Sequence, residues 1–340
     1  MAERTSPRRK RELARADKVL PGIWRLRLPA PWPGVPHSNA FAIAAGDGVV
    51  LVDCGFHEPG SAAQLERALD QAGLRLEHVR LLVCTHAHSD HYGNAAVVVD
   101  AAGCELWMHP NHAHVTRAEQ EPERALERRI EVALQCGVPA ETVDRYREAR
   151  AGTGSGIARV VLPDRELLPG VEVETDLGTW HVYETPGHAP SHVVLHQPER
   201  KLLLSGDHLL GRVSLWFDVG HTPDPAGEFL LSLDVVAELK VGLCLAGHGR
   251  PFRDVPALIS ANRREVLAGV ERVRRALEPG PLTAYQLLPA VLGTADLNPM
   301  LVNWGLTQVL SYLRYLELRE RVRRLEPREQ GGPERWELTR

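Results

Sequence analysis

The sequence lacks the features that mark a membrane or secreted protein. No uninterrupted apolar run approaches the roughly 20 residues that a membrane-spanning helix requires. The first 17 residues are rich in arginine and are interrupted by Glu3 and Glu12, without an apolar stretch or a secretory cleavage pattern. We therefore expect residues 1–17 to be a disordered basic start, no association with a membrane, and a cytoplasmic location.

The sequence also lacks a large net charge and an even number of cysteines that could all form pairs. The net charge of −4 at pH 7 gives the chain no general attraction to nucleic acid. The five cysteines are odd in number and scattered, and Cys54, Cys84 and Cys244 each end an apolar run, which is typical of buried free thiols in a reducing compartment. The 340 residues have the ordinary apolar and charged fractions of a globular protein, enough for one large core and a smaller domain.

The most informative segment reads Thr-His-Ala-His-Ser-Asp-His and occupies positions 85–91. Four of its residues can bind a metal ion: His86, His88, Asp90 and His91. The segment follows His78–Cys84, a run rich in Val and Leu that predicts a buried strand. Alternation directs the first two histidines the same way, whereas the aspartate and third histidine come after the turn, which suits two neighbouring metal ions better than one. A solvated polar turn is the alternative, but so dense a histidine cluster is costly to desolvate without a cation.

Three further candidate ligands each follow a predicted strand. His188 comes after the apolar run Trp180–Glu184, Asp207 after Lys201–Leu204, and His248 after Val241–Leu245. The glycine directly before each of them lets the backbone turn tightly, so that the next side chain can point at a metal. Together with the histidine-rich segment they predict one site assembled from several strand ends.

These segments resemble the metallo-β-lactamase superfamily, especially its hydroxyacylglutathione-hydrolase-like branch, over about Gly22–Arg253. All five signature segments are present, beginning with Leu51-Val-Asp53-Cys-Gly55. The resemblance implies an α/β fold, a four-layer αβ/βα sandwich with its site at the rim between two sheets. It also implies two metal sites that share one carboxylate: His86, His88 and His188 at the first, Asp90, His91 and His248 at the second, and Asp207 between them.

The implied ligand set is that of a metal-dependent hydrolase with two divalent ions per chain. Nitrogen and carboxylate ligands without thiolate favour Zn²⁺, although iron or manganese also fits. Two such ions lower the pKa of a bound water to near 7, so that a metal-bound hydroxide attacks the substrate while one ion polarises the carbonyl oxygen. We expect two catalytic carboxylates: Asp90, which binds an ion and orients the hydroxide, and Asp53, which fixes the orientation of the ligands.

The expected substrate is a small-molecule ester, thioester or lactone, with glutathione-like or acyl thioesters favoured. Leu210 occupies the position where the similar quorum-signal lactonases usually carry tyrosine, which counts against that activity. An aspartate at the bridging position, and no secretion pattern, count against a β-lactamase. Because two metals serve phosphoryl displacement equally well, a phosphodiesterase or endoribonuclease is the alternative enzyme. A binding protein with a relict site is the alternative outside enzymes, and the complete ligand set argues against it.

Two other groups of residues concern the surroundings of the site. The candidates for substrate contact are His192, Trp216, Phe217 and His221. The aromatic residues after the bridging aspartate either line a pocket or pack against the fold. A second histidine cluster comprises His109, His112 and His114. We interpret it as solvated histidines at the start of a helix, because the main ligand set is already complete.

Two segments are additional to the strands and helices that a minimal αβ/βα sandwich needs. Within the expected catalytic domain, residues 18–255, a charged helix-forming segment spans residues 118–151, with Leu126, Ile130 and Leu134 at helical spacing. It is either a lid over the site or a surface decoration, since insertions near a site often carry specificity.

The last segment, residues 256–340, predicts a long helix, further helices and a closing hairpin. This order resembles the winged-helix appendage of lactamase-like endoribonucleases. Winged helices can bind nucleic acid through a recognition helix, but the predicted helix Asn303–Leu318 has Arg314 as its only basic residue. Acidic neighbours also dilute the basic run Arg319–Arg324. We therefore favour a solvated or homodimer-forming appendage over one that binds nucleic acid.

Overall fold

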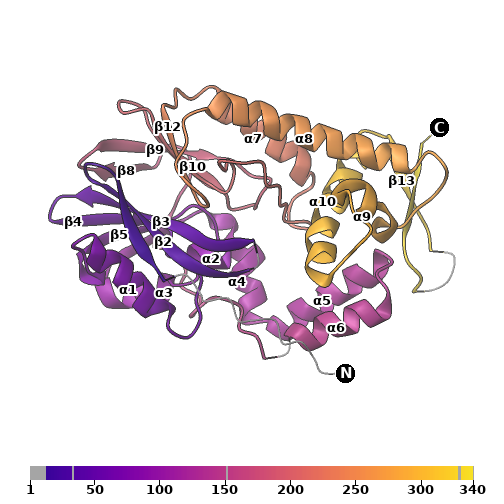
Figure 1. The fold of residues 1–340 in the computed structure, drawn as a ribbon, viewed down its shortest axis with the longest axis horizontal. Helices are drawn as coiled ribbons and strands as arrows, with labels where there is room; N and C mark the ends of the chain where they lie inside the picture. Colours follow the sequence, from indigo (N-terminus) through magenta and orange to yellow (C-terminus); the bar gives the residue numbers. More distant parts are fainter. Residues whose placement is uncertain (1–12, 33, 151, 328–330, 340) are drawn as a thin grey trace.

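The computed structural model describes residues 13–32, 34–150, 152–327 and 331–339. Two β-sheets pack face to face, and helices cover the outer face of each one (Figure 1). The expected four-layer α/β sandwich is confirmed. None of the described helices is both long and apolar enough to cross a lipid bilayer.

The first sheet has seven strands that are neighbours in chain order. They are β1 (Arg15–Leu20), β2 (Ile23–Trp32), β3 (Val35–Ala45), β4 (Gly48–Val52), β5 (Val79–Cys84), β6 (Glu105–Met108) and β7 (Arg165–Glu166). Strands β4 to β7 run parallel. In β4, Val49 and Leu51 face the outer helices, whereas Val50 and Val52 face the second sheet. A strand buried on both faces reads as a continuous apolar run, as the sequence of β4 does.

The second sheet has five strands in the order β12-β11-β10-β9-β8. Their bounds are β8 (Glu172–Thr175), β9 (Gly178–Glu184), β10 (Val193–Gln197), β11 (Leu202–Gly206) and β12 (Leu243–Ala246). Strands β11 and β12 are parallel. Because the carboxyl ends of parallel strands meet at one edge, the residues that follow β11 and β12 come together, as do those that follow β4 and β5.

Helices on the two outer faces complete the sandwich. The first sheet is covered by α1 (Ser61–Gln71) and α3 (Ala95–Ala102), with the one-turn helix α2 (Ser89–Tyr92) and two 3₁₀ turns, η1 (Leu76–His78) and η2 (Pro110–His112), in the connections. The second sheet is covered by α7 (Pro225–Ala237) and α8 (Val255–Ala276). Asp224 and Asp254 cap α7 and α8 by accepting hydrogen bonds from Gly227 and Ala257.

The remaining helices belong to the insertion and to the C-terminal segment. The insertion contains α4 (Ala113–Gln120), α5 (Pro122–Gln135) and α6 (Ala140–Arg150); the C-terminal segment contains α9 (Ala284–Leu292), α10 (Pro299–Glu317), β13 (Val322–Leu325) and β14 (Arg335–Leu338). Figure 1 shows α5 and α6 beside α9 and α10. The backbone N–H of Tyr285 donates to the carbonyl of Cys136 at 2.9 Å, and that of Glu334 to the carbonyl of Gln135 at 2.8 Å. The insertion therefore packs against the C-terminal segment.

Two expected boundaries differ from the structure. Residues 1–12 of the expected disordered start lie outside the described residues, but Arg15–Asp17 belong to β1 and Ala14 is buried, so the expectation is wrong there. The backbone N–H of Ala14 donates to Gln64 Oε1 at 2.9 Å and ties this end to α1. The insertion's helices begin at Ala113, five residues before the predicted start. The division at residue 255, the winged-helix likeness and a homodimer stay predictions.

Candidate metal centre

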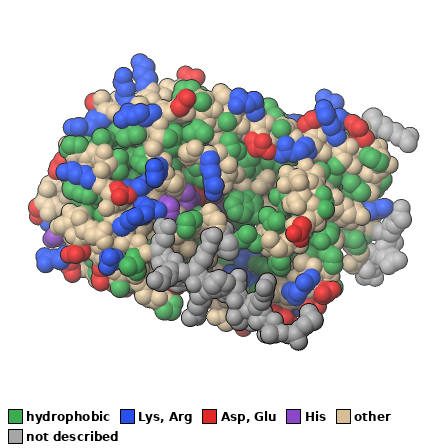
Figure 2. Space-filling view, viewed as in Figure 1, with side chains coloured by type: hydrophobic (Ala, Val, Ile, Leu, Met, Phe, Trp, Pro, Cys, Tyr) green, Lys and Arg blue, Asp and Glu red, His purple; other side chains and the backbone are tan. Residues whose placement is uncertain are grey.

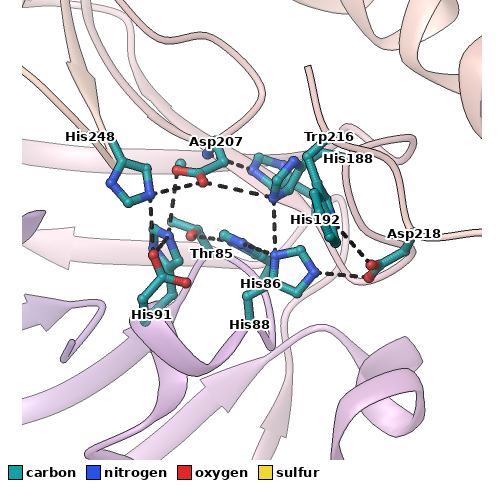
Figure 3. Close-up of polar contacts among 12 residues, drawn as sticks. Thr85, His86, His88, His91, His188, His192, Asp207, Trp216, Asp218 and His248 are labelled. Carbon is teal, nitrogen blue, oxygen red and sulfur yellow. Dashed lines mark hydrogen bonds and ion pairs between the residues drawn. The ribbon is translucent and has the colours of Figure 1, made fainter. Parts of the chain in front are cut away.

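The seven predicted ligands meet at the edge of the sandwich where the strands end. Their donor atoms form three overlapping groups, and within each group these atoms lie within 4.8 Å of one another: His86, His88 and His188; His86, His91 and Asp207; Asp90, His91 and His248. Figure 3 shows that side chains from both sheets point toward one another, and it labels six of these ligands: His86, His88, His91, His188, Asp207 and His248. The ligands lie far apart in the sequence. The parallel strand pairs β4–β5 and β11–β12 bring the segments that carry them to the same edge.

Three ring nitrogens converge in the first group. His88 Nδ1 lies 3.1 Å from His86 Nε2 and 3.0 Å from His188 Nε2. The other nitrogen of His88, Nε2, donates to Asp218 Oδ2 at 2.9 Å, so in the neutral ring Nδ1 presents a lone pair. A single proton cannot satisfy three converging nitrogens, whereas a cation can accept all three lone pairs.

The second group combines imidazoles with carboxylates. His91 donates from Nδ1 to Asp53 at 2.9 Å, and its Nε2 lies 3.5 Å from Asp90 and 3.4 Å from Asp207. Among the described residues, His91 Nε2 and Asp207 Oδ1 are buried atoms without a hydrogen-bond partner. His248 donates from Nδ1 to a backbone carbonyl at 2.9 Å, and its Nε2 lies 3.1 Å from both carboxylates. Buried atoms left unsatisfied in this way fit a bound cation.

In the absence of metal, the pKa values of these ligands are shifted in opposite directions. Burial and the neighbouring His88 lower the pKa of His188 to about 4. Burial also opposes protonation of His248, but the carboxylates of Asp207 and Asp90 outweigh it and raise its pKa to about 10. Burial would raise the pKa of Asp90, but the adjacent imidazoles hold it at about 2. Such opposed shifts within one cluster mark a functional site and suit neutral histidine and ionised aspartate ligands.

Small residues make room for the bridging carboxylate. A Cβ atom on Gly247 would lie 2.2 Å from Asp207 Oδ1 and 2.7 Å from His91 Cε1. Gly206 has a φ of +47°, and a Cβ atom there would lie 2.6 Å from His192 Nε2. The donor set, the orphaned atoms and this space together fit the metal ions that the ligand pattern implies.

Asp53 lies behind the ligands. It follows β4 with a φ of +62°, in the left-handed region that few residues other than glycine adopt. Its carboxylate accepts hydrogen bonds from Thr85 N at 2.8 Å and from His91 Nδ1 at 2.9 Å. Asp53 therefore orients a ligand, whereas Asp90 lines the adjacent cavity.

Two residues of this site were missed by the sequence analysis. The carboxylate of Asp218 accepts from His88 and also contacts His114 Nδ1, both at 2.9 Å. His114 Nε2 lies 2.9 Å from Ser191 Oγ, which accepts from Ala87 N at 3.1 Å. The His114 side chain is only 3% exposed, so its interpretation as a solvated histidine is wrong. The same interpretation is wrong for His109, which is buried and contacts Glu184.

The four predicted substrate contacts divide into two pairs. Trp216 and His221 line the cavity beside the metal-binding cluster. Phe217 is fully buried and packs against Phe229 and Tyr312, so the prediction for it is wrong. His192 is also buried; its Nε2 accepts from Asp207 N at 3.0 Å, so it supports the bridging aspartate and does not reach substrate.

The cavity has a volume of about 2400 Å³. Its lining includes His88, Asp90, His188, Asp207 and His248. Residues of the insertion and of α10 also line it. Five of the seven predicted ligands are therefore accessible to a substrate, and the insertion and the C-terminal segment form part of the walls.

Known proteins are similar to this chain in sequence. The pattern that describes the metallo-beta-lactamase superfamily matches residues 33–248. The probable metallo-hydrolase YqjP of Bacillus subtilis (strain 168) is 28% identical over 260 residues, covering 73% of this chain and 80% of its own. A hydroxyacylglutathione hydrolase of Anaeromyxobacter dehalogenans (strain 2CP-C) is 28% identical over 271 residues, covering 77% and 80%.

A solved structure extends the likeness beyond the sandwich. The crystal structure of a metallo-beta-lactamase family protein from Thermus thermophilus matches with a TM-score of 0.80 and 28% identity, and covers 95% of this chain and 100% of that one. The insertion and the C-terminal segment therefore belong to an architecture that is found elsewhere. Because the matched pattern covers more than half of the chain and includes all seven converging residues, the protein belongs to the metallo-β-lactamase superfamily.

Proposed function

We propose that the protein is a dinuclear metal-dependent hydrolase that cleaves a thioester or a related ester. The observation that carries this proposal is the convergence of seven nitrogen and oxygen ligands in adjoining groups beside an open cavity. Two divalent ions bound there would supply an activated water and a Lewis acid for the substrate carbonyl. The histidine-rich donor set suits zinc, with iron or manganese as alternatives.

The chain's own residues divide the remaining tasks. His86, His88 and His188 would hold one ion, Asp90, His91 and His248 the other, and Asp207 both. The Asp90 carboxylate lines the cavity, so it can also accept a hydrogen bond from the attacking water and orient it. Asp53 is buried and does not line the cavity, so it is a positioning residue rather than the catalytic one that the sequence predicts.

Several observations support an acyl substrate. The Anaeromyxobacter relative is named for hydrolysis of a hydroxyacylglutathione, which is a thioester. Leu210 lines the cavity at the position where the similar lactonases carry tyrosine, which favours a thioester over a lactone. The five cysteines are free and buried, as predicted, and this supports the proposed cytoplasmic location.

Metal content and turnover test the proposal together. The purified chain should hold two ions per molecule by elemental analysis and hydrolyse S-lactoylglutathione or acyl thioesters faster than a lactone or bis(p-nitrophenyl) phosphate. Asp90→Ala should lower kcat by several orders of magnitude, because it removes both a ligand and the partner of the water. Asp100→Ala on α3, which loses only an exposed ion pair with Arg159, is the matched control. A folded protein that holds at most one ion under metal-replete conditions, or that turns over only the phosphodiester, would refute the proposal.

A further inference from the structure

The cavity is too large for a small acyl thioester alone. Its volume of about 2400 Å³ exceeds the roughly 300–1,000 Å³ of ordinary ligand pockets. The metal-binding cluster forms part of its lining, and further parts come from α4, α5, α6, α10 and the segments that carry Arg212 and Arg250. Figure 2 shows hydrophobic and basic side chains gathered around a hollow in this face, beside histidine atoms. The side chains on the cavity walls should therefore indicate the chemistry of the part of the substrate that does not react.

One part of the walls is aliphatic. It is formed by residues of two helices of the insertion and of α10: Leu126, Ile130, Val143, Val302, Leu306 and Leu310. The same residues belong to, or pack against, the core cluster that joins the insertion to the C-terminal segment. Burying an alkyl chain against an apolar cavity wall is favourable, and the gain grows with each CH₂ group that is removed from water.

A second part of the walls is basic. Six arginines line the cavity: Arg117, Arg128, Arg129, Arg150, Arg212 and Arg250. In the described part of the chain none of the six forms an ion pair. Away from the metal-binding cluster the acidic lining residues are Glu58, Glu119 and Glu123, so this lining carries a net positive charge.

On α5 and α6, the arginines that form ion pairs are those that do not line the cavity. Those that do not line the cavity are paired: Arg124 with Glu121 at 3.1 Å, Arg145 with Glu141 at 3.7 Å, and Arg147 with Glu127 at 3.4 Å. Arg128, Arg129 and Arg150 on the same helices line the cavity and lack such partners within the described residues. Unpaired guanidinium groups around a cavity are poised to bind an anionic ligand, and their fork geometry matches phosphate.

We propose, on the basis of the thioester hydrolysis proposed above, that the substrate is a long-chain acyl thioester whose thiol carrier is phosphorylated, as in acyl coenzyme A. The alkyl chain lies along the aliphatic wall, and the phosphates lie against the arginines. In the reaction the oxygen of water forms a bond to the carbonyl carbon, the C–S bond breaks, and the thiol leaves with a proton from water. The products are a fatty carboxylate, a free thiol and one released proton.

The two kinds of wall together favour this class over others. Glutathione thioesters are small and present no alkyl chain to the aliphatic wall. Single-stranded RNA would occupy the arginines but offers no aliphatic group for that wall. Phosphopantetheine is shared by coenzyme A and by acyl carrier proteins, so the arms of the test separate these two sources.

Binding is measured first, because it does not depend on turnover. Isothermal titration of the metal-loaded full chain with S-hexadecyl-coenzyme A, a thioether that cannot be hydrolysed, should give micromolar affinity. Affinity should fall at least tenfold for S-hexadecyl-pantetheine, which lacks phosphates, and for coenzyme A, which lacks the chain. Arg129→Gln with Arg150→Gln should weaken the coenzyme A thioether at least tenfold and leave the pantetheine thioether unchanged.

The control pair is Arg124→Gln with Arg145→Gln, which removes the same charge from the same two helices outside the cavity. It should leave both affinities unchanged. Leu126→Asp, on the aliphatic wall, should lower kcat/KM for palmitoyl-coenzyme A and spare acetyl-coenzyme A. Palmitoyl carrier protein, tested beside palmitoyl-coenzyme A, shows which phosphopantetheine source is preferred, and a preference for either supports the proposal.

Other outcomes separate the two proposals. Tight, arginine-dependent binding of the thioether without any thioester turnover would refute the hydrolase and leave the ligand assignment standing. Turnover of small thioesters with no gain from the alkyl chain or the phosphates, and no effect of Arg129 and Arg150, would overturn the ligand assignment alone. RNA that displaces the thioether, and whose binding needs the same two arginines, would also overturn it.

Discussion

At the scale of single residues, the metal-facing histidines are fixed from behind. His88 donates its outer N–H to Asp218, His91 donates to Asp53, and His248 donates to the backbone carbonyl of His37. Each bond selects the tautomer that leaves a lone pair on the inward nitrogen. The site is therefore preorganised by the protein before an ion binds.

Asp218→Asn tests this arrangement. The amide can accept from one imidazole but cannot neutralise both His88 and His114, so metal affinity or kcat/KM should fall about 10–100-fold. Isothermal titration with zinc after chelation measures the first quantity, and thioester hydrolysis at saturating zinc the second. Asp234→Asn, which alters only the ion pair of Asp234 with Arg263 on α7 and α8, is the matched control. Wild-type affinity and turnover in Asp218→Asn would contradict the assigned role.

The opposed pKa shifts predict how pH affects the metal-free protein. Burial and His88 hold the pKa of His188 at about 4, below its ordinary value of 6.5, so stability is lost as pH falls from 6.5 toward 4. For His248, carboxylates outweigh burial and raise the pKa to about 10, so that stability is present below pH 6.5 and is lost as pH rises to about 10. Urea midpoints should therefore peak near pH 6.5 without metal.

Loading the protein with metal is the control for this profile. Bound imidazoles are neutral ligands, so the loss of stability between pH 6.5 and 10 should disappear when the ions are present. A flat urea midpoint across that range in the metal-free protein would show that His248 does not hold its proton as proposed.

Residue types at strand ends were predictable, whereas contacts across distant segments were not. The seven candidate ligands each follow an apolar run and stand in recognisable local patterns. Asp218 and His114 carry no such signal, because they meet only when α4 and the segment after Asp207 pack together beside His88. Phe217 was wrongly placed in the pocket for the same reason: Phe229 and Tyr312, from α7 and α10, bury it.

At the scale of elements, α10 holds the segment that carries Asp218. Trp304 Nε1 donates to the carbonyl of Leu215 at 2.8 Å, and Gln308 Nε2 donates to the same carbonyl at 3.1 Å. Nearer the end of the helix, Arg314 Nε donates to the carbonyl of Pro223 at 3.0 Å. The C-terminal segment thus reaches the metal-binding cluster through one loop.

Trp304→Phe isolates this connection. The phenyl ring keeps most of the apolar packing but loses the hydrogen bond to the carbonyl of Leu215, a loss of about 1 kcal/mol. We expect a small drop in melting temperature and a several-fold fall in kcat, with both ions still bound, because the loop that positions Asp218 is loosened. Trp107→Phe, whose indole bonds an exposed glutamate on β6, is the control. Equal kcat in both variants would mean that α10 does not influence the site.

The insertion shows where prediction of elements reaches its limit. Helical spacing and charge predicted the helical character of α5 and α6. Their packing partner was not predictable, because it lies about 150 residues further along the chain. On these helices Leu126, Ile130 and Val143 both contribute to the core shared with α9 and α10 and line the cavity.

At the scale of the whole molecule, sandwich and appended helices share one core. A single cluster of buried residues runs from the second sheet through α7 and α8 to α9, α10 and the hairpin β13–β14. The C-terminal segment therefore serves as a wall of the cavity, which leaves less reason to assign it a separate ligand. The same segment carries the basic run Arg319–Arg324, which follows α10.

The basic run Arg319–Arg324 is the feature that would favour RNA. In the structure Arg323 pairs with Glu337 at 2.5 Å, Arg324 with Glu334 at 3.1 Å and Arg319 with Asp224 at 2.9 Å. Acidic residues therefore already occupy three of its guanidinium groups. With a net charge of −4 for the whole chain, we expect weak or absent binding of single-stranded RNA at physiological salt.

A salt titration of RNA binding, run beside a thioesterase assay, measures this. Each phosphate contact would add about −0.7 to the slope of log affinity against log salt for a single strand, so a slope near zero is expected. Changing Arg321, Arg323 and Arg324 together to glutamine should leave thioester hydrolysis intact, because none of the three lines the cavity. Two results together would refute the proposed thioester hydrolysis and identify a ribonuclease instead. They are tight, salt-dependent RNA binding that the triple variant loses, and RNA cleavage that requires His86 and Asp90.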